Sequence, residues 1–146
     1  MKYLVVAIFT VLVFASLLPF SGGAQERQSL DITSLKINFE GTDAVFTVNY
    51  DLGALSRLYV LLLGSKNMEP ILKSVFSEFD YQIIKMDQDN AVLKVKGFAR
   101  YEKGYFLHDS RKLGETIRTI YIYTPDSARA REFSNLNSTP PMFYRS

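Results

Sequence analysis

The 146-residue sequence contains no cysteine, no tryptophan and one histidine, His108. Without cysteine the chain has no disulfide framework, no thiolate nucleophile and no iron–sulfur site. One imidazole excludes a multi-histidine metal centre within one chain, because such ligands come in twos and threes. The net charge of +2 is too small to indicate nucleic-acid binding. We therefore expect no metal, no cofactor and no nucleic-acid partner.

Apolar and aromatic residues are abundant. Hydrophobic residues make up 47% of the sequence, which contains 11 Phe and 9 Tyr. This content is sufficient for a hydrophobic core and argues against a disordered chain. At this length we expect one domain, whose core must stabilise it without disulfides.

Residues 1–24 are typical of an export signal. Lys2 precedes the uncharged, apolar run 3–20, which a proline and several small residues then end. This order predicts cleavage between Ala24 and Gln25. The alternative is an uncleaved N-terminal transmembrane anchor, because the run reaches the lower end of the roughly 17–25 residues that span a bilayer. In both cases the domain lies outside the cytoplasm, at the cell envelope or in the extracellular medium.

Residues 25–30 form a polar tether, and residues 31–146 are expected to form a single domain. Apolar and polar residues alternate over 35–40 and over 46–50, which is typical of half-buried antiparallel strands. The turn-forming residues 41–43 between them predict a hairpin. Further strands are predicted at 81–86, 91–101 and 116–124.

Two helices are predicted between the second and third strands. Apolar residues cluster at helical spacing over 52–64, where Gly64 is expected to end a deeply buried helix. Glu69 and Pro70 begin a second helix with an apolar inner stripe. The stripe comprises Ile71, Leu72, Val75, Phe76 and Phe79. The order β-β-α-α-β-β-β predicts an α+β fold, in which a helical hairpin packs on one face of an antiparallel sheet of about five strands.

The C-terminal segment 133–146 is expected to be extended. Its last residues are apolar, so it either folds back over an open sheet edge or docks on a partner. Asn137 begins an Asn-Ser-Thr sequence, which is an acceptor for an N-linked glycan if the chain is exported by a host that glycosylates.

The string His108-Asp109-Ser110-Arg111 contains the residue types of a hydrolytic triad. Three adjacent residues rarely place their side chains in the contacts that a triad needs. We interpret the string as a polar loop in which Asp109 or Ser110 caps a turn. A second interpretation is that the loop that begins at His108 binds an anionic group with Arg111 and Lys112, since arginine offers a planar fork of donors.

The small net charge hides two oppositely charged portions of the chain. Residues 25–90 carry a net charge of −4 and residues 91–146 one of +5. One explanation is pairing between early acidic and later basic strands. The other is a basic stripe on the solvent face of the sheet that binds an envelope polymer, an anionic lipid surface or an acidic protein. The stripe would comprise Lys94, Lys96, Arg100 and Lys103, with Arg118 beside them.

Three classes of function remain open. We expect a non-catalytic binding or assembly module at the cell envelope, because no nucleophile or metal constellation stands out. A small hydrolase would need His108 to converge with carboxylates from distant segments. A carrier of an apolar ligand would need a void between sheet and helices. Its lining would comprise Tyr59, Leu62, Phe76 or Tyr121.

Overall fold

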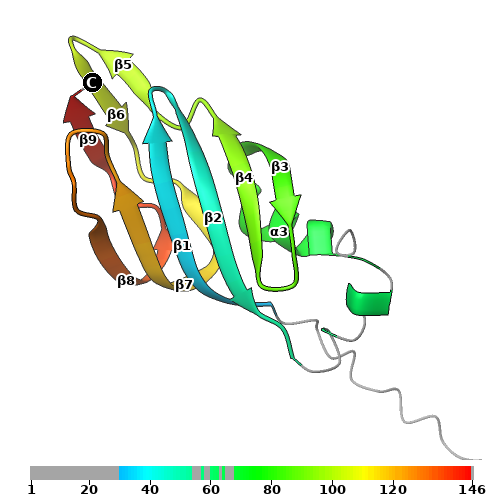
Figure 1. Cartoon of the computed structure of the whole chain (residues 1–146). Coiled ribbons are helices and arrows are strands. Elements are labelled where there is room, and N and C mark those ends of the chain that lie inside the picture. Colours follow the sequence, from blue (N-terminus) through cyan, green and yellow to red (C-terminus); the bar gives the residue numbers. More distant parts are fainter. Residues whose placement is uncertain (1–29, 54–56, 58–59, 63, 65–67, 146) are drawn as a thin grey trace, which may run out of the picture.

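The computed structural model describes residues 30–53, 57, 60–62, 64 and 68–145 (Figure 1). Strands make up 60% of the structure and helices 11%. The strands form a mixed six-stranded sheet and a separate three-stranded sheet. The predicted α+β fold, a five-stranded antiparallel sheet with a helical hairpin on one face, is therefore wrong. The chain is mostly β.

The six-stranded sheet has the order β3-β4-β2-β1-β7-β8, and the small sheet has the order β5-β6-β9. Strands β1 and β7 pair in parallel, and every other pair of strands is antiparallel. In chain order the described elements are β1 (Asp31–Glu40), β2 (Asp43–Asp51), α3 (Glu69–Val75), β3 (Asp80–Met86), β4 (Asn90–Lys96), β5 (Arg100–Glu102), β6 (Tyr105–His108), β7 (Lys112–Tyr123), β8 (Arg131–Ser138) and β9 (Met142–Arg145).

Strands β1 and β2 form the hairpin that the alternating pattern predicts. They pair antiparallel up to Glu40 opposite Asp43, and a tight turn joins them. Gly41 has a φ of 63° in this turn, a left-handed conformation that glycine adopts without the clash of a Cβ atom. The predicted strands 81–86 and 116–124 are confirmed as β3 and as part of β7.

The predicted strand 91–101 is interrupted. Strand β4 ends at Lys96, and Gly97 has a φ of 56°, which turns the chain. Phe98 then enters the core and is 1% exposed, although the alternation places it on the basic, outward side. The backbone of this turn is held by the first hairpin, because Gly97 N donates to Asp43 Oδ1 at 3.1 Å and Ala99 N donates to Thr42 O at 2.9 Å.

The predicted helical hairpin is the main error. Its second helix is confirmed as α3, which has a proline in its first turn and only seven residues. The predicted first helix, 52–64, lies partly outside the described residues. Residues 57 and 60–62 are helical, and Gly64 takes the left-handed φ of 85°. Of the described residues there, Val60 is buried, but Leu61 and Leu62 are 64% and 74% exposed, so this part of the segment is not deeply buried as expected.

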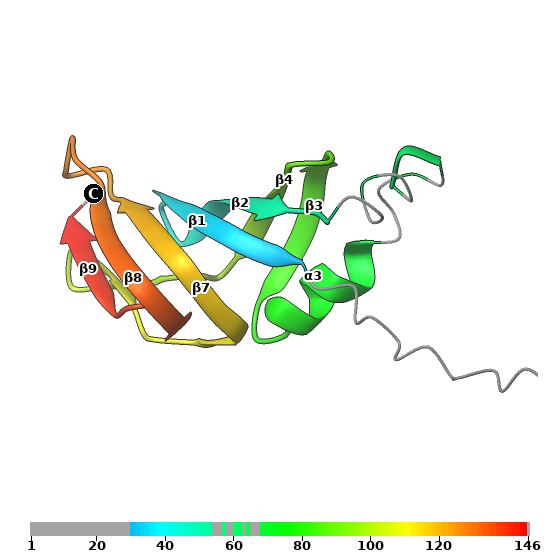
Figure 2. The ribbon, with the colours of Figure 1, turned by 90° about the horizontal axis from the view of Figure 1, so that it is seen from below.

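The core lies on one face of the six-stranded sheet. Phe46 of β2 contacts Phe76 and Phe79, which follow α3, with ring centroids 5.8 and 5.6 Å apart. Phe39 of β1 contacts Tyr144 of β9 at 4.8 Å. Figure 2 shows α3 near one end of the molecule and β9 near the other. Helix α3 and the small sheet thus cover different parts of the same apolar face.

The C-terminal segment folds back onto the domain. It contains most of β8 and all of β9, and β9 pairs with β6 so that Met142 and Tyr144 are buried. No helix in the described part of the chain is long and apolar enough to cross a membrane. The expected export segment, with Ala24 and Gln25, lies outside the described residues.

Candidate functional site

His108 lies at the end of β6 and is 2% exposed. Its Nδ1 lies 2.7 Å from Phe98 O, and its Nε2 lies 2.8 Å from Thr139 Oγ1. The imidazole also stacks on the Phe98 ring, with centroids 3.8 Å apart. Because a carbonyl oxygen only accepts, Nδ1 carries the proton and Nε2 accepts from the Thr139 hydroxyl. His108 is therefore a buried, neutral imidazole with both nitrogens bound.

The surroundings of His108 oppose its protonation. Burial has the largest effect and lowers the pKa of the imidazole. The hydrogen bond to Phe98 O raises the pKa in part, the positive charge of Arg111 lowers it again, and Asp109 has the smallest, raising effect. The Thr139 hydroxyl also accepts a hydrogen bond from Arg111 N at 3.0 Å. His108 therefore sits in an internal hydrogen-bond network, and among the described residues its two nitrogens bond to Phe98 and Thr139 and to no carboxylate.

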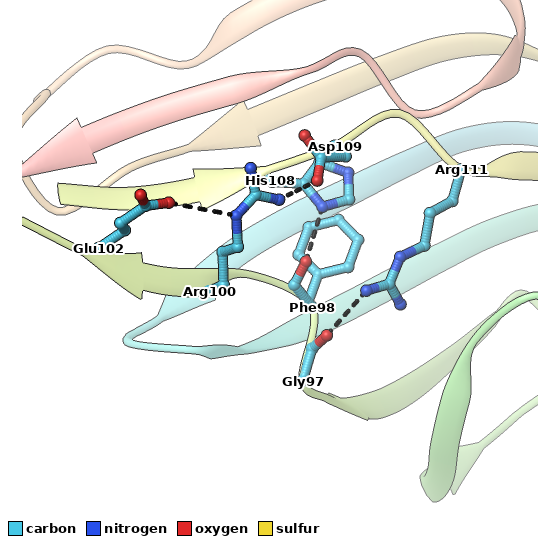
Figure 3. Close-up of polar contacts among 7 residues, drawn as sticks. All are labelled: Gly97, Phe98, Arg100, Glu102, His108, Asp109 and Arg111. Carbon is cyan, nitrogen blue, oxygen red and sulfur yellow. Dashed lines mark hydrogen bonds and ion pairs between the residues drawn. The ribbon is translucent and has the colours of Figure 1, made fainter.

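The charged residues around His108 are bound to one another or to the backbone (Figure 3). Arg100 forms ion pairs with Asp109 and Glu102. Arg111 reaches across to donate to Gly97 O at 2.9 Å. The segment after His108 is thus an internally bonded loop. The guanidinium groups of Arg100 and Arg111 therefore both have partners within the chain and do not need an added anion as a partner.

The residues of the expected basic stripe come from two different sheets. Lys94 and Lys96 belong to β4, whereas Arg100 and Lys103 belong to the β5–β6 hairpin of the small sheet. Lys94 Nζ contacts Glu40 Oε2 at 3.3 Å, and Arg118 contacts Asp31 Oδ2 at 2.9 Å. These two ion pairs join the acidic early part of the chain to its basic later part. They agree with the explanation that the acidic early strands pair with the basic later strands.

Other candidate residues are dispersed. Asn137 is exposed on β8, where a glycan would project into solvent. The residues expected around an apolar ligand do not surround one void: Phe76 is fully buried, Leu62 is exposed, and Tyr121 alternates with the buried Ile120 and Ile122 on the opposite face of β7. Tyr59 lies outside the described residues.

A groove of about 940 Å³ lies between α3 and β3. Its apolar lining comes from Phe76 and Phe79 after α3 and from Tyr81 and Ile83 in β3. The Phe79 ring also lies under the guanidinium of Arg111, whose Cζ is 5.8 Å from the ring centroid. The groove is open to solvent and is not a closed cavity.

Three charged side chains line the same groove, Glu69 and Lys73 from α3 and Asp80 from β3. Within the described part of the chain none of them forms an ion pair. The pKa of Tyr81 is raised by burial and by the nearby Glu69 carboxylate. The groove therefore combines an apolar floor with unpaired charges, in contrast to the paired charges around Arg100 and Arg118.

Sequence reasoning missed both Thr139 and the groove. Thr139 was visible only as the last residue of the glycan acceptor sequence, yet it is fully buried against His108. The apolar stripe of α3 was recognised as core, but the sequence pattern of residues 80–86 does not show that β3 is an edge strand beside this helix. That arrangement depends on which strands pair.

Comparison with protein-family models, with curated proteins and with solved structures finds no match to this chain. Among the described residues no group of three or more His, Asp or Glu side chains has the geometry to hold a metal ion. The interpretation of the groove therefore depends on its own chemistry.

Proposed function

We propose that this chain is an exported, non-catalytic binding module that attaches to a component of the cell envelope through the groove between α3 and β3. The groove is the single observation that carries the proposal. It joins an apolar lining with charged side chains that form no ion pair within the part of the chain that the structure describes, the combination by which protein surfaces recognise partners with affinity and orientation. The cell envelope is proposed as the location because residues 1–24 have the pattern of an export signal.

The environment of His108 favours binding over hydrolysis. A general base must reach the proton that it abstracts, directly or through one water. Both nitrogens of His108 are instead bound by Phe98 and Thr139, inside the core. The basic residues Lys94, Arg100 and Arg118 form ion pairs within the chain, so we assign the binding of the partner to the groove.

Retention of the purified chain on the isolated envelope fraction of its host tests this function. Ser77 is exposed and lines the groove, so Ser77→Phe fills the groove without altering the core. We expect this variant to lose retention at both low and high salt, because apolar contacts are not screened. Ser134→Phe, which places the same side chain on exposed β8, is the matched control and is expected to be retained.

The triple variant Lys94→Gln, Lys96→Gln and Arg100→Gln separates the groove from the basic residues. Retention that falls only in this triple variant, and only at low salt, assigns binding to the basic residues and refutes the groove. Retention that is unaffected by Ser77→Phe refutes it as well. N-terminal sequencing of the secreted chain tests the predicted cleavage before Gln25.

A further inference from the structure

We propose that the ligand of the groove is an extended peptide segment that adds as a strand to residues 80–83 of β3 and carries alternating apolar side chains with a basic residue beside them. This inference rests on the proposed binding function and specifies its partner.

The described strands include four edge strands, and they differ in how they are protected. In the two sheets β3, β8, β5 and β9 each pair on one side only. Strands β5 and β9 have three and four residues. Strand β8 is irregular, because its register against β7 shifts and Asn135 has a φ of 55°. Short and distorted edges resist pairing with other chains.

Strand β3 is protected over its second half only. Its register against β4 shifts between Ile83 and Lys85, and Lys85 forms an ion pair with Asp87 at 2.6 Å. Bulges and lysines are both devices that stop strand addition. The first half, Asp80 to Ile83, pairs regularly with β4 and leaves its outer backbone groups without a strand partner in the described structure.

The regular half of β3 is the half that lines the groove, because Asp80, Tyr81, Gln82 and Ile83 all belong to the lining. An added strand places every second side chain on the inner face of the sheet. There these side chains would meet Tyr81 and Ile83, which are partly exposed above the buried rings of Phe76 and Phe79. Main-chain hydrogen bonds then supply affinity, and the groove selects apolar residues at alternate positions.

The charges of the groove select the ligand further. Glu69 and Asp80 outnumber Lys73 on the lining, and none of the three is paired within the described residues. A peptide with a lysine or arginine beside its apolar residues complements this negative excess. A second copy of the chain is the competing occupant, since edge strands also pair with themselves.

Selection from a phage-displayed library of linear heptapeptides on the purified full-length chain tests the proposal. A selected peptide is resynthesised with a terminal tryptophan, whose fluorescence is specific because the chain has none. N-methylation is then placed at each peptide position in turn. Because only alternate N–H groups of an added strand face β3, we expect binding to weaken by about tenfold at every second position and little at the others.

Charge reversal tests the chemistry of the lining. Asp80→Lys is expected to weaken a basic peptide by about fivefold, and exchange of the basic residue for glutamate in the peptide is expected to restore binding. Glu132→Lys, an equal charge change on exposed β8, is the matched control and is expected to have no effect. The thermal midpoint of each variant verifies that it is folded.

Three results overturn the inference: no peptide enrichment over the Ser77→Phe chain, equal sensitivity to N-methylation at all positions, or a dimer that sedimentation shows and Asp80→Lys abolishes. If no peptide binds but envelope retention still requires the groove, strand addition fails and the proposed function stands. If envelope retention is also unchanged in Ser77→Phe, both strand addition and the proposed function fail.

Discussion

His108 lies where three connections between strands meet. Its two nitrogens bind Phe98 of the β4–β5 connection and Thr139 of the β8–β9 connection, and Thr139 in turn binds the backbone of Arg111 between β6 and β7. A buried polar network stabilises a fold only while every member is satisfied. Protonation of His108 would direct a second N–H at Thr139 Oγ1, whose hydroxyl would then turn to Arg111 O at 3.4 Å, a long hydrogen bond.

The chain is therefore expected to lose stability in mild acid. The folded pKa of His108 lies below its unfolded value, so the unfolded chain binds the proton first as the pH falls. The contribution of His108 is fully present above pH about 6.5 and decreases by at most about 1.4 kcal/mol for each pH unit below it, down to the folded pKa. Urea unfolding at pH 7.5 and 5.5 measures this decrease.

The variant His108→Gln separates this effect from the titration of carboxylates. We expect it to be less stable than the natural chain at pH 7.5 and to lose less stability between the two pH values. The charged groups that act on the imidazole are Arg111 and Asp109. Equal loss of stability in the natural chain and in His108→Gln would show that the imidazole is not the titrating group.

At the scale of elements, helix α3 is held against β7 by a very close approach of two backbones. A Cβ atom added to Gly114 would overlap Ser74 O and lie 2.9 Å from Val75 Cα. We expect Gly114→Ala to lower the free energy of unfolding by about 1–3 kcal/mol, because backbone atoms cannot move aside as a flexible side chain does. Chemical denaturation measures the loss.

Gly53→Ala is the matched control, since a Cβ atom there has nothing within 4 Å and the φ is not in the left-handed region. It is expected to be neutral or slightly stabilising. Comparable destabilisation by both variants would mean that the approach of α3 to β7 is not what requires glycine. Because α3 forms one wall of the groove, Gly114→Ala is also expected to weaken envelope retention.

Local patterns predict elements where one face of a strand is buried. The alternation in β1 and β2 and the turn between them were recognisable, because each residue faces either core or solvent over the whole hairpin. The prediction failed at Gly97, where one residue with positive φ redirects Phe98 into the core. It failed again in the predicted helix 52–64, where Leu61 and Leu62 are exposed rather than buried.

The groove was beyond sequence reasoning for a different reason. The apolar stripe of α3 and the alternation in β3 are visible in the sequence, but they do not say that β3 is an edge strand. That position follows from the pairing of β2 with β4 and of β1 with β7, which joins residues far apart in the sequence, such as Val48 with Ala91 and Leu35 with Ile120. Such non-local pairing is not encoded in local periodicity.

At the scale of the whole molecule, the small sheet is an addition to the main sheet, stabilised through its C-terminal strand. Tyr144 of β9 is 2% exposed, stacks on Phe106 of β6 at 5.1 Å, and contacts Phe39 of β1. Its hydroxyl donates to Gly41 O at 2.6 Å in the turn of the first hairpin. Burial raises the pKa of Tyr144 to about 12, so the hydroxyl keeps its proton in alkaline solution as well as at neutral pH.

Tyr144→Ala is therefore expected to detach the small sheet. We expect a loss of about 3–5 kcal/mol in unfolding free energy, because a buried aromatic ring is removed. Without β9 the β5–β6 pair is an isolated hairpin, which is marginal in water, so its amides should exchange with deuterium much faster than those of β2 and β4. Phe143→Ala, a neighbour that is 65% exposed, should cost less than about 0.5 kcal/mol and leave exchange unchanged. Equal exchange rates in the two variants would contradict the role of Tyr144 and show that the small sheet is held by other contacts.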